Sequence, residues 1–337
     1  MKYFLLLLSP FLWSQVNLEE NPQSFILETK RIELPEFPDA FNPSIARWQE
    51  YFLLSFRVIP DPKTPFISYI GVVLLDDNFD PIVEPQLLQT RPHSSIPSRA
   101  ADARLIPIGK SLYIIYTDNV DEKVTAGGYR MYIGELIYDN NAFSIHNPMH
   151  LHQFEGENPT RKEQNWVPFV YQGHLLLAYS LTPHLIFHPL PQSDECETIA
   201  STHAPIHWPF GPLHGGTPAL PLDTDHYLSF FHSWKKMATS HSNGIEMPHY
   251  FMGAYLFSST PPFQITHISL EPIIAPGFYS GAIYKPYWGA LRCIFPSGFL
   301  FDDQYIWILY GRQDHEIWLM KLDRPALLHS LTPIKEN

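Results

Sequence analysis

A phrase of about sixteen residues occurs five times along the chain, and this repetition constrains the fold more than any other feature. Each copy opens on small or polar residues, passes through a short apolar run to a polar turn, and closes on a run rich in aromatic residues. This pattern is typical of a β-hairpin. The copies are Asn42–Arg57, Asp102–Asp118, Asn165–Ser180, Thr217–His232 and Pro296–Gly311. They begin about 50 to 80 residues apart, and a repeat of this kind predicts a propeller or a solenoid.

A third strand-like run follows each hairpin. These runs are Tyr69–Asp77, Tyr132–Asn140, His184–Leu190, Phe251–Ser259 and Glu316–Asp323. Each repeat therefore holds at least three antiparallel strands, which is most of a four-stranded propeller blade. Several strands are nearly continuous in apolar residues, as expected when neighbouring blades cover both faces of a sheet. We therefore predict an all-β chain that forms a five-bladed β-propeller, in which closure of the ring removes free sheet edges.

The composition agrees with one compact β body. Of 337 residues, 45% are apolar and 15% aromatic, which supplies a large core, and 33 prolines disfavour long helices. Propellers of this length form single closed units, so we expect one domain over residues 16–337. The net charge is −12 and no cluster of lysine and arginine stands out, which argues against nucleic acid as a partner.

The N-terminal segment and the two cysteines bear on where the protein works. An apolar stretch, Tyr3–Trp13, follows Lys2; it fits the core of a signal peptide and is too short for an ordinary membrane span. We expect residues 1–15 to be a signal peptide, the protein to be secreted or periplasmic, and no stable membrane span. The alternatives are a buried N-terminal strand and a cytoplasmic protein. Cys196 and Cys293 match no zinc motif, so we expect buried thiols, with one disulfide as the alternative in an oxidising compartment.

The register of the five phrases predicts one shared pocket. In a propeller the first strand of each blade runs along the central axis, so the residues that open the phrases should converge on one funnel, with the residues that close them nearby. The polar residues expected there are Asn42, Arg57, Asp102, Asn165, His214, His232, Tyr310 and Asp314. The chain has seventeen histidines but no H-E-x-x-H motif, and we expect no metal site.

Asp102 is the candidate for catalysis. A carboxyl group in a partly enclosed funnel can have its pKa raised by desolvation and act as a general acid, whereas the guanidinium of Arg104 opposes that shift unless it faces an anionic group of the substrate. The alternative is an Asp-Arg pair that braces the end of a strand. Arg57 and His232 each follow an apolar strand, where they can either cap the strand or bind anions and sugar hydroxyls in the pocket.

Five short motifs carry a resemblance to a known family. In chain order they are Asn42-Pro43 with Arg57, Ala101-Asp102-Ala103-Arg104, Glu163-Gln164-Asn165-Trp166, Phe295-Pro296-Ser297-Gly298, and Tyr310-Gly311 with Asp314. In order and spacing they resemble glycoside hydrolase family 130, the β-mannoside phosphorylases and related hydrolases, and the neighbouring β-1,2-mannosyltransferases. The resemblance spans about Asn42 to Asp323 and implies a five-bladed propeller that acts on β-mannosides.

The resemblance also implies roles for single residues. Asp102 corresponds to the proton donor, which in the inverting phosphorylases works through a sugar hydroxyl. The residues implied around the sugar of the −1 subsite are Asn42, Arg57 and Asp314, and those implied near phosphate or its substitute are Arg104 and His232. Inversion needs a second agent on the opposite face of the sugar, which is phosphate or a water activated by a base.

Three positions depart from the family motifs. Gln164 stands where the family has a lysine, although Lys162 is two residues away, and Ala101 and Ala103 replace a glutamate and a proline. The acceptor is therefore left open between phosphate, water and another sugar. We expect a carbohydrate-active enzyme whose substrate is an oligosaccharide or glycan, with inorganic phosphate as the one candidate co-substrate and no other cofactor. The alternative is a propeller that binds a glycan or a protein without catalysis.

Overall fold

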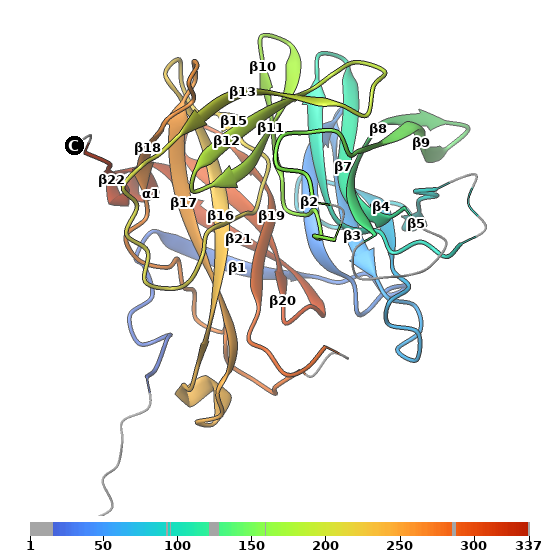
Figure 1. The fold of residues 1–337 in the computed structure, drawn as a ribbon. Helices are drawn as coiled ribbons and strands as arrows, with labels where there is room; N and C mark the ends of the chain where they lie inside the picture. The colour runs from blue at the N-terminus through green and yellow to red at the C-terminus, as the bar shows by residue number, and fades with distance from the viewer. Residues whose placement is uncertain are drawn as a thin grey trace, which may run out of the picture.

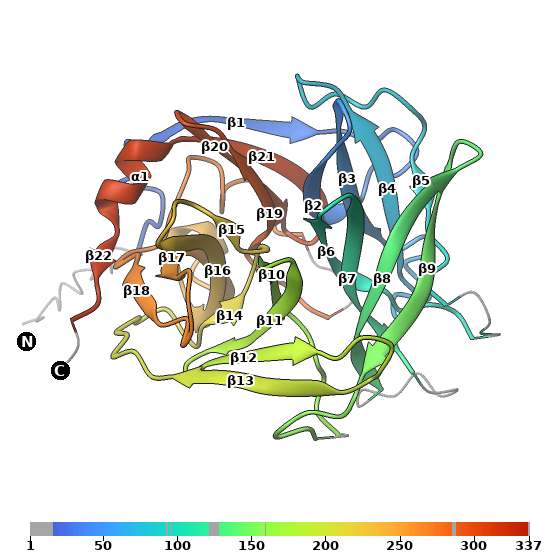
Figure 2. The ribbon, with the colours of Figure 1, turned by 90° about the horizontal axis from the view of Figure 1, so that it is seen from above.

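Five antiparallel β-sheets surround a central axis in the computed structural model of this chain (Figures 1 and 2). The structure describes residues 16–335 except 92, 93, 95, 121–127, 159 and 285–287. Each sheet is one blade, and seen along the axis the blades follow one another around the ring (Figure 2). This arrangement confirms the predicted all-β class and the five-bladed β-propeller. The expected signal peptide, residues 1–15, lies outside the described residues.

The first three blades each contain four strands that are consecutive in the chain and in the sheet. Blade 1 consists of β2 (Phe41–Trp48), β3 (Tyr51–Val58), β4 (Tyr69–Leu75) and β5 (Gln86–Leu87). Blade 2 consists of β6 (Ala101–Ile108), β7 (Ser111–Asn119), β8 (Tyr129–Asp139) and β9 (Ala142–Leu151). Blade 3 consists of β10 (Val167–Tyr171), β11 (His174–Leu181), β12 (His184–Pro189) and β13 (Cys196–Thr202).

The last two blades are completed by strands from the two ends of the chain. Blade 4 consists of β14 (His214–Gly215), β15 (Leu220–Pro221), β16 (His226–Met237), β17 (Met247–Ser258), β18 (Ile265–Ile268) and the C-terminal β22 (Thr332–Pro333). Blade 5 consists of β19 (Ile294–Phe301), β20 (Tyr305–Arg312), β21 (Glu316–Asp323) and the N-terminal β1 (Ile26–Ile32). Because β1 pairs antiparallel with β21, the start of the chain supplies the outer strand of the last blade and closes the ring.

Two short helical segments accompany the strands. Helix α1 (Arg324–Ser330) connects β21 to β22, and a 3-10 turn, η1 (Ser240–Ser242), lies in the connection between β16 and β17. The β16–β17 hairpin extends well beyond the other blades on the lower side of Figure 1. In the part of the chain that the structure describes, no helix has the length and apolar character needed to cross a membrane.

The blades pack face to face, which explains why the strands are apolar in consecutive positions. In β3, five successive residues, 52–56, are buried, because both faces of the sheet are covered. The predicted hairpins and third strands agree with the observed ones; β21 has the predicted bounds of Glu316–Asp323. Cys196 in β13 and Cys293 before β19 are both buried free thiols, so neither takes part in a disulfide.

Candidate active site

The inner strands converge on a pocket of about 330 Å³ whose lining comes from all five blades. Seven of the nine candidate site residues line it; they are Asn42, Arg57, Asp102, Asn165, His214, His232 and Asp314. The register of the repeated phrase therefore brings together residues from distant parts of the chain, as expected. The other two, Arg104 and Tyr310, lie behind the pocket wall.

Four of the lining residues, Asn42, Asp102, Asn165 and Asp314, share an unusual backbone conformation with a positive φ angle. Asn42, Asp102 and Asn165 precede or begin the inner strands of blades 1, 2 and 3, and their φ angles are 48°, 54° and 64°. Asparagine and aspartate tolerate this left-handed region better than most residues. Beside Asn42 and Asp102 the pairing of the inner strand shifts register, which marks a bulge, and bulges turn side chains out of the regular ladder. A recurrent Asn or Asp thus lets the chain present a polar side chain to the pocket.

Asp102 is held by an amide and lies beside a guanidinium. Asn42 Nδ2 donates a hydrogen bond of 2.8 Å to Asp102 Oδ1, and Arg57 Nη1 lies 3.8 Å from the same oxygen. The Arg57 guanidinium also lies over the ring of Phe41, with Cζ 5.2 Å from the ring centroid. Both contacts of the Asp102 carboxyl involve Oδ1. Within the described part of the chain, Oδ2 takes part in neither contact, so this oxygen is left for a ligand.

Asp314 is the second carboxyl group of the pocket. Burial raises the pKa of Asp314 to about 6, and the negative charge of Asp102 adds to that shift. The positive charge of Arg57 opposes it, as do hydrogen bonds with Cys293 and Trp288. The last two residues also line the pocket, and the sequence pattern did not select them. Asp314 therefore changes its protonation state close to neutral pH, which a surface aspartate does not do.

One side of the pocket is basic. Arg99 Cζ lies 4.6 Å from the centroid of the Tyr129 ring, and Lys162 Nζ lies 5.5 Å from the same centroid. Neither side chain takes part in the ion pairs found within the described part of the chain. Arg99 was not among the expected site residues. Lys162 and Gln164 both line the pocket, so Lys162 brings a positive charge close to the position where the family has lysine.

Two stacked histidines form another part of the lining. His214 in β14 pairs with His232 in β16, and their ring centroids are 5.3 Å apart at an interplanar angle of 26°. Burial lowers the pKa of His214, and it lowers the pKa of His232 well below the ordinary value. Both imidazoles are therefore neutral at pH 7, and each can donate one hydrogen bond and accept another.

Arg104 joins the inner strands and does not face the pocket. It is 1% exposed, and its Nε donates a hydrogen bond of 2.8 Å to the carbonyl oxygen of Gly216. Its Nη1 donates to the backbone carbonyl of Asp102, and its Nη2 to Asn165 Oδ1 at 3.4 Å. Burial lowers the pKa of Arg104 to about 10, so it remains a cation at neutral pH. The position implied by the family motif, near phosphate, differs from this one: Arg104 braces blades 2, 3 and 4 from behind.

Tyr310 is also absent from the pocket lining. Its side chain is 1% exposed and packs in the core between blades 4 and 5, against Phe278 and Trp318. In β20 the residues alternate between the two faces of the sheet, and Tyr310 occupies a core-facing position. After β20, the residue that reaches the pocket is Asp314, which lies in the following turn.

Neither a protein-family model nor a curated protein matches the sequence. Solved structures do match. The β-1,2-mannobiose phosphorylase of Listeria innocua, in complex with β-1,2-mannobiose, has 16% identity and a TM-score of 0.56, over 90% of this chain and 92% of that chain. A GDP-Man-dependent mannosyltransferase of Leishmania mexicana has 12% identity and a TM-score of 0.58, over 93% and 95%.

A third structure comes from work on glycoside hydrolase family 130, a family of mannoside phosphorylases that contains hydrolases of β-1,2 mannosidic linkages in Candida mannan. It has 12% identity and a TM-score of 0.57, over 93% of this chain and 95% of that chain. The chain thus has the fold of the propellers of this family, which confirms the fold implied by the five motifs. The matched structures include phosphorylases, hydrolases and a transferase, so the fold alone does not select the acceptor.

Proposed function

We propose that the protein is a carbohydrate-active enzyme that acts on β-mannosides, with Asp102 as the proton donor and inorganic phosphate as the acceptor. A phosphate oxygen would attack the anomeric carbon from the face opposite the leaving group. The glycosidic bond would break, and the proton of Asp102 would reach the leaving oxygen through a sugar hydroxyl, as the family resemblance implies. The products would be a mannose 1-phosphate of inverted configuration and a sugar shortened by one unit.

The observation that carries this proposal is the setting of Asp102. Its Oδ1 is fixed by Asn42 and lies beside Arg57, while Oδ2 is left for a substrate. A positioned carboxyl group in a pocket is what general acid catalysis requires. Asp314 and the two neutral imidazoles supply further groups that can bind the hydroxyls of a sugar.

Phosphate is favoured by the charge of the pocket. The lining contains three permanent cations and two carboxyl groups, which leaves one net positive charge when both carboxyls are ionised. The whole chain carries −12, so this pocket differs in sign from the rest of the molecule. A site of this kind concentrates anions, and Arg99 and Lys162 have donors suited to phosphate oxygens.

Aromatic side chains fit the same site to a sugar chain. Trp234 and Tyr250 pair across β16 and β17, with ring centroids 6.4 Å apart at 26°, and both line the pocket. Trp234 and Trp288 are each 39% exposed, which is unusual for a residue of this size. Their flat apolar faces can pack against the faces of pyranose rings beyond the reacting unit.

Incubation with a panel of manno-oligosaccharides, with and without phosphate, tests the proposal. Phosphate-dependent release of mannose 1-phosphate is the expected result. Release of free mannose without phosphate would make the protein a hydrolase, and extension of a chain from an activated donor would make it a transferase. Saturable sugar binding with no product under any of these conditions would support the non-catalytic alternative.

Export of the protein is proposed on residues 1–15 alone, and N-terminal sequencing of the mature chain tests it.

Lys162 is expected to bind the acceptor more than the sugar. Replacement Lys162→Ala should raise the KM for phosphate about tenfold, because a charge-assisted hydrogen bond to an anion is lost. The affinity for the oligosaccharide should change little. Lys110→Ala is the control, since Lys110 is exposed in the β6–β7 turn and does not line the pocket. An unchanged KM for phosphate in Lys162→Ala would contradict the assignment of this side of the pocket.

Gly311 leaves room for the amide that orients Asp102. A Cβ at Gly311 would lie 2.2 Å from Asn42 Oδ1 and 2.9 Å from Asn42 N. We expect Gly311→Ala to displace Asn42 and so weaken its hydrogen bond to Asp102, which should lower kcat by about tenfold or more. The variant should be assayed together with its melting temperature. Normal turnover in a folded Gly311→Ala variant would show that this hydrogen bond is not needed.

A further inference from the structure

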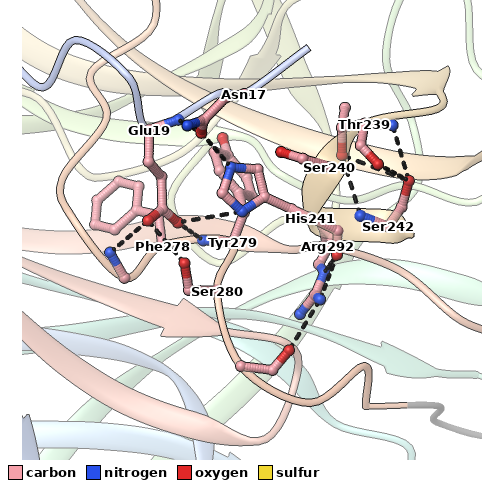
Figure 3. Close-up of polar contacts among 12 residues, drawn as sticks. Asn17, Glu19, Thr239, Ser240, His241, Ser242, Phe278, Tyr279, Ser280 and Arg292 are labelled. Atoms are coloured by element: carbon pink, nitrogen blue, oxygen red, sulfur yellow. Dashed lines mark hydrogen bonds and ion pairs between the residues drawn. The ribbon is translucent and has the colours of Figure 1, made fainter. Parts of the chain in front are cut away.

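The segment that follows residue 15 is bound to a loop that forms part of the pocket wall. The carboxylate of Glu19 accepts hydrogen bonds from the backbone N–H of Gly277 at 2.9 Å and of Tyr279 at 2.6 Å, and from Ser280 Oγ at 2.9 Å (Figure 3). The side chain of Glu19 is 12% exposed. Burial alone would raise the pKa of Glu19, but these three hydrogen bonds lower it below the ordinary value, so the group is ionised at neutral pH.

The same segment also contacts the tip of the β16–β17 hairpin. Asn17 Oδ1 lies 2.9 Å from His241 Nε2, and Glu19 Oε1 lies 3.9 Å from His241 Nδ1 (Figure 3). The backbone N–H of Ser240 donates to the carbonyl oxygen of Val16 at 3.0 Å. Residues 16–19 therefore lie between two parts of the chain that are more than thirty residues apart, residues 240–241 and 277–280.

Two arginines tie the same loop to the blades. Arg292 donates from Nη2 to Gly281 O at 3.0 Å and from Nη1 to Ala282 O at 3.2 Å, which joins the two arms of the loop. Arg312, at the end of β20, donates from Nε to Gly277 O at 2.9 Å. Glu19 therefore binds the N–H groups of a short stretch whose carbonyl groups are bound by two arginines. Removal of the carboxylate would leave the N–H groups of that stretch without this partner, and the stretch would be held by the two arginines and by the buried side chains of Phe278 and Tyr279.

The loop leads directly into the pocket. Trp288 and Cys293 lie on its second arm, and both line the pocket together with Asp314. The backbone N–H of Gln313 donates to Cys293 O at 2.8 Å, so the turn that carries Asp314 is joined to the same arm. Arg312 is two residues before Asp314. The position of Asp314 thus depends on the loop through a short series of hydrogen bonds.

We propose that Glu19 is a positioning residue of the active site: its carboxylate fixes residues 277–280 and, through them, the wall that carries Trp288 and Cys293 against Asp314. This role adds a positioning residue to the proposed active site, and it rests on the proposed function only for the experiment that measures turnover. The residue lies in the N-terminal segment, in none of the five repeated phrases, and its effect reaches the pocket through the loop.

The thiol of Cys293 offers a test that does not require turnover. Cys293 is 2% exposed, so alkylation by N-ethylmaleimide requires the wall to open. In Glu19→Ala the rate of alkylation of Cys293, followed by mass spectrometry, should rise about tenfold, with a smaller rise in Glu19→Gln. Cys196 in blade 3 is the internal reference and should react at an unchanged rate. Glu20→Gln is the matched control, because Glu20 is the exposed neighbour of Glu19.

Equal alkylation of Cys293 in Glu19→Ala and in the unmodified protein would overturn the proposal. A parallel rise at Cys196 and Cys293 would also overturn it, because it would show loss of stability throughout the propeller. If Glu19→Ala does not fold, Glu19→Gln carries the test. Where the enzyme turns over mannosides, Glu19→Gln should raise KM about tenfold with a smaller effect on kcat, since Asp102 is not contacted. Absence of turnover in the unmodified protein would contradict the proposed function and leave the alkylation result standing.

Discussion

Replacement of Asp102 by asparagine is expected to lower turnover by about 10³-fold while the oligosaccharide still binds, because a general acid is lost without a change of shape. The amide oxygen of the variant can still accept the hydrogen bond from Asn42, which measures 2.8 Å in the structure. The pocket should therefore keep its form. Turnover and the Kd for the oligosaccharide should be measured on the same preparation.

The control for this variant is Asp77→Asn, because Asp77 is exposed in the turn after β4 and outside the pocket. Full activity in Asp102→Asn would remove Asp102 as the proton donor. Loss of sugar binding together with turnover would mean that Asp102 holds the substrate instead. A double variant with Asn42→Ala should add little to the loss in turnover, because Asn42 acts on catalysis through the carboxyl it orients.

Replacement of Asp314 by asparagine should change activity and stability in opposite directions. The pKa of Asp314 is raised from 3.8 to about 6, so between those values the native protein holds a proton that the unfolded chain has released. This group's contribution to stability therefore falls as the pH rises from about 4 to 6. Above that range the ionised form costs up to about 3 kcal/mol. Asparagine removes this cost, while turnover should fall about 100-fold, because the ionised carboxylate that can bind a sugar hydroxyl is lost.

Melting temperatures measured from pH 4 to pH 8 separate the stabilisation that comes from removing the ionised carboxylate from a stabilisation that does not depend on pH. At pH 4 the unmodified protein and Asp314→Asn should melt at nearly the same temperature. At pH 7.5 the variant should melt several degrees higher. A difference that is constant over the whole range would show that the protonation of Asp314 does not contribute to it.

The periodic part of the site could be predicted from the sequence, because its residues occupy equivalent places in a repeat. Asn42, Asp102 and Asn165 mark the beginnings of three phrases, and each needs a left-handed backbone that Asn or Asp tolerates. Arg99 and Trp288 could not be found in this way. They lie in irregular segments between blades, where no period fixes which side chain faces the axis.

Arg104 shows a different limit of the repeat. Arg104 lies close to the opening of the second phrase, where pocket residues were expected, but its side chain does not point into the pocket. The register shift between Ala101 and Arg104 sends Asp102 to the pocket and leaves Arg104 in the wall, where its donors reach the carbonyl of Gly216. A bulge cannot be read from apolar periodicity, because its extra residue breaks the alternation by which a face is assigned.

The pairing of β1 with β21 has a consequence for how the protein is made. Ile26–Ile32 leaves the ribosome early, but its partner, Glu316–Asp323, follows about 290 residues later. For the whole of synthesis this strand has no sheet to join, and an unpaired apolar strand is a site of aggregation. Its sequence, ILETKRI, carries three charges and a threonine in seven residues, and most of it remains accessible in the finished blade. Charges on an edge strand oppose its association with other chains, so we expect Lys30 and Arg31 to limit aggregation before the last blade forms.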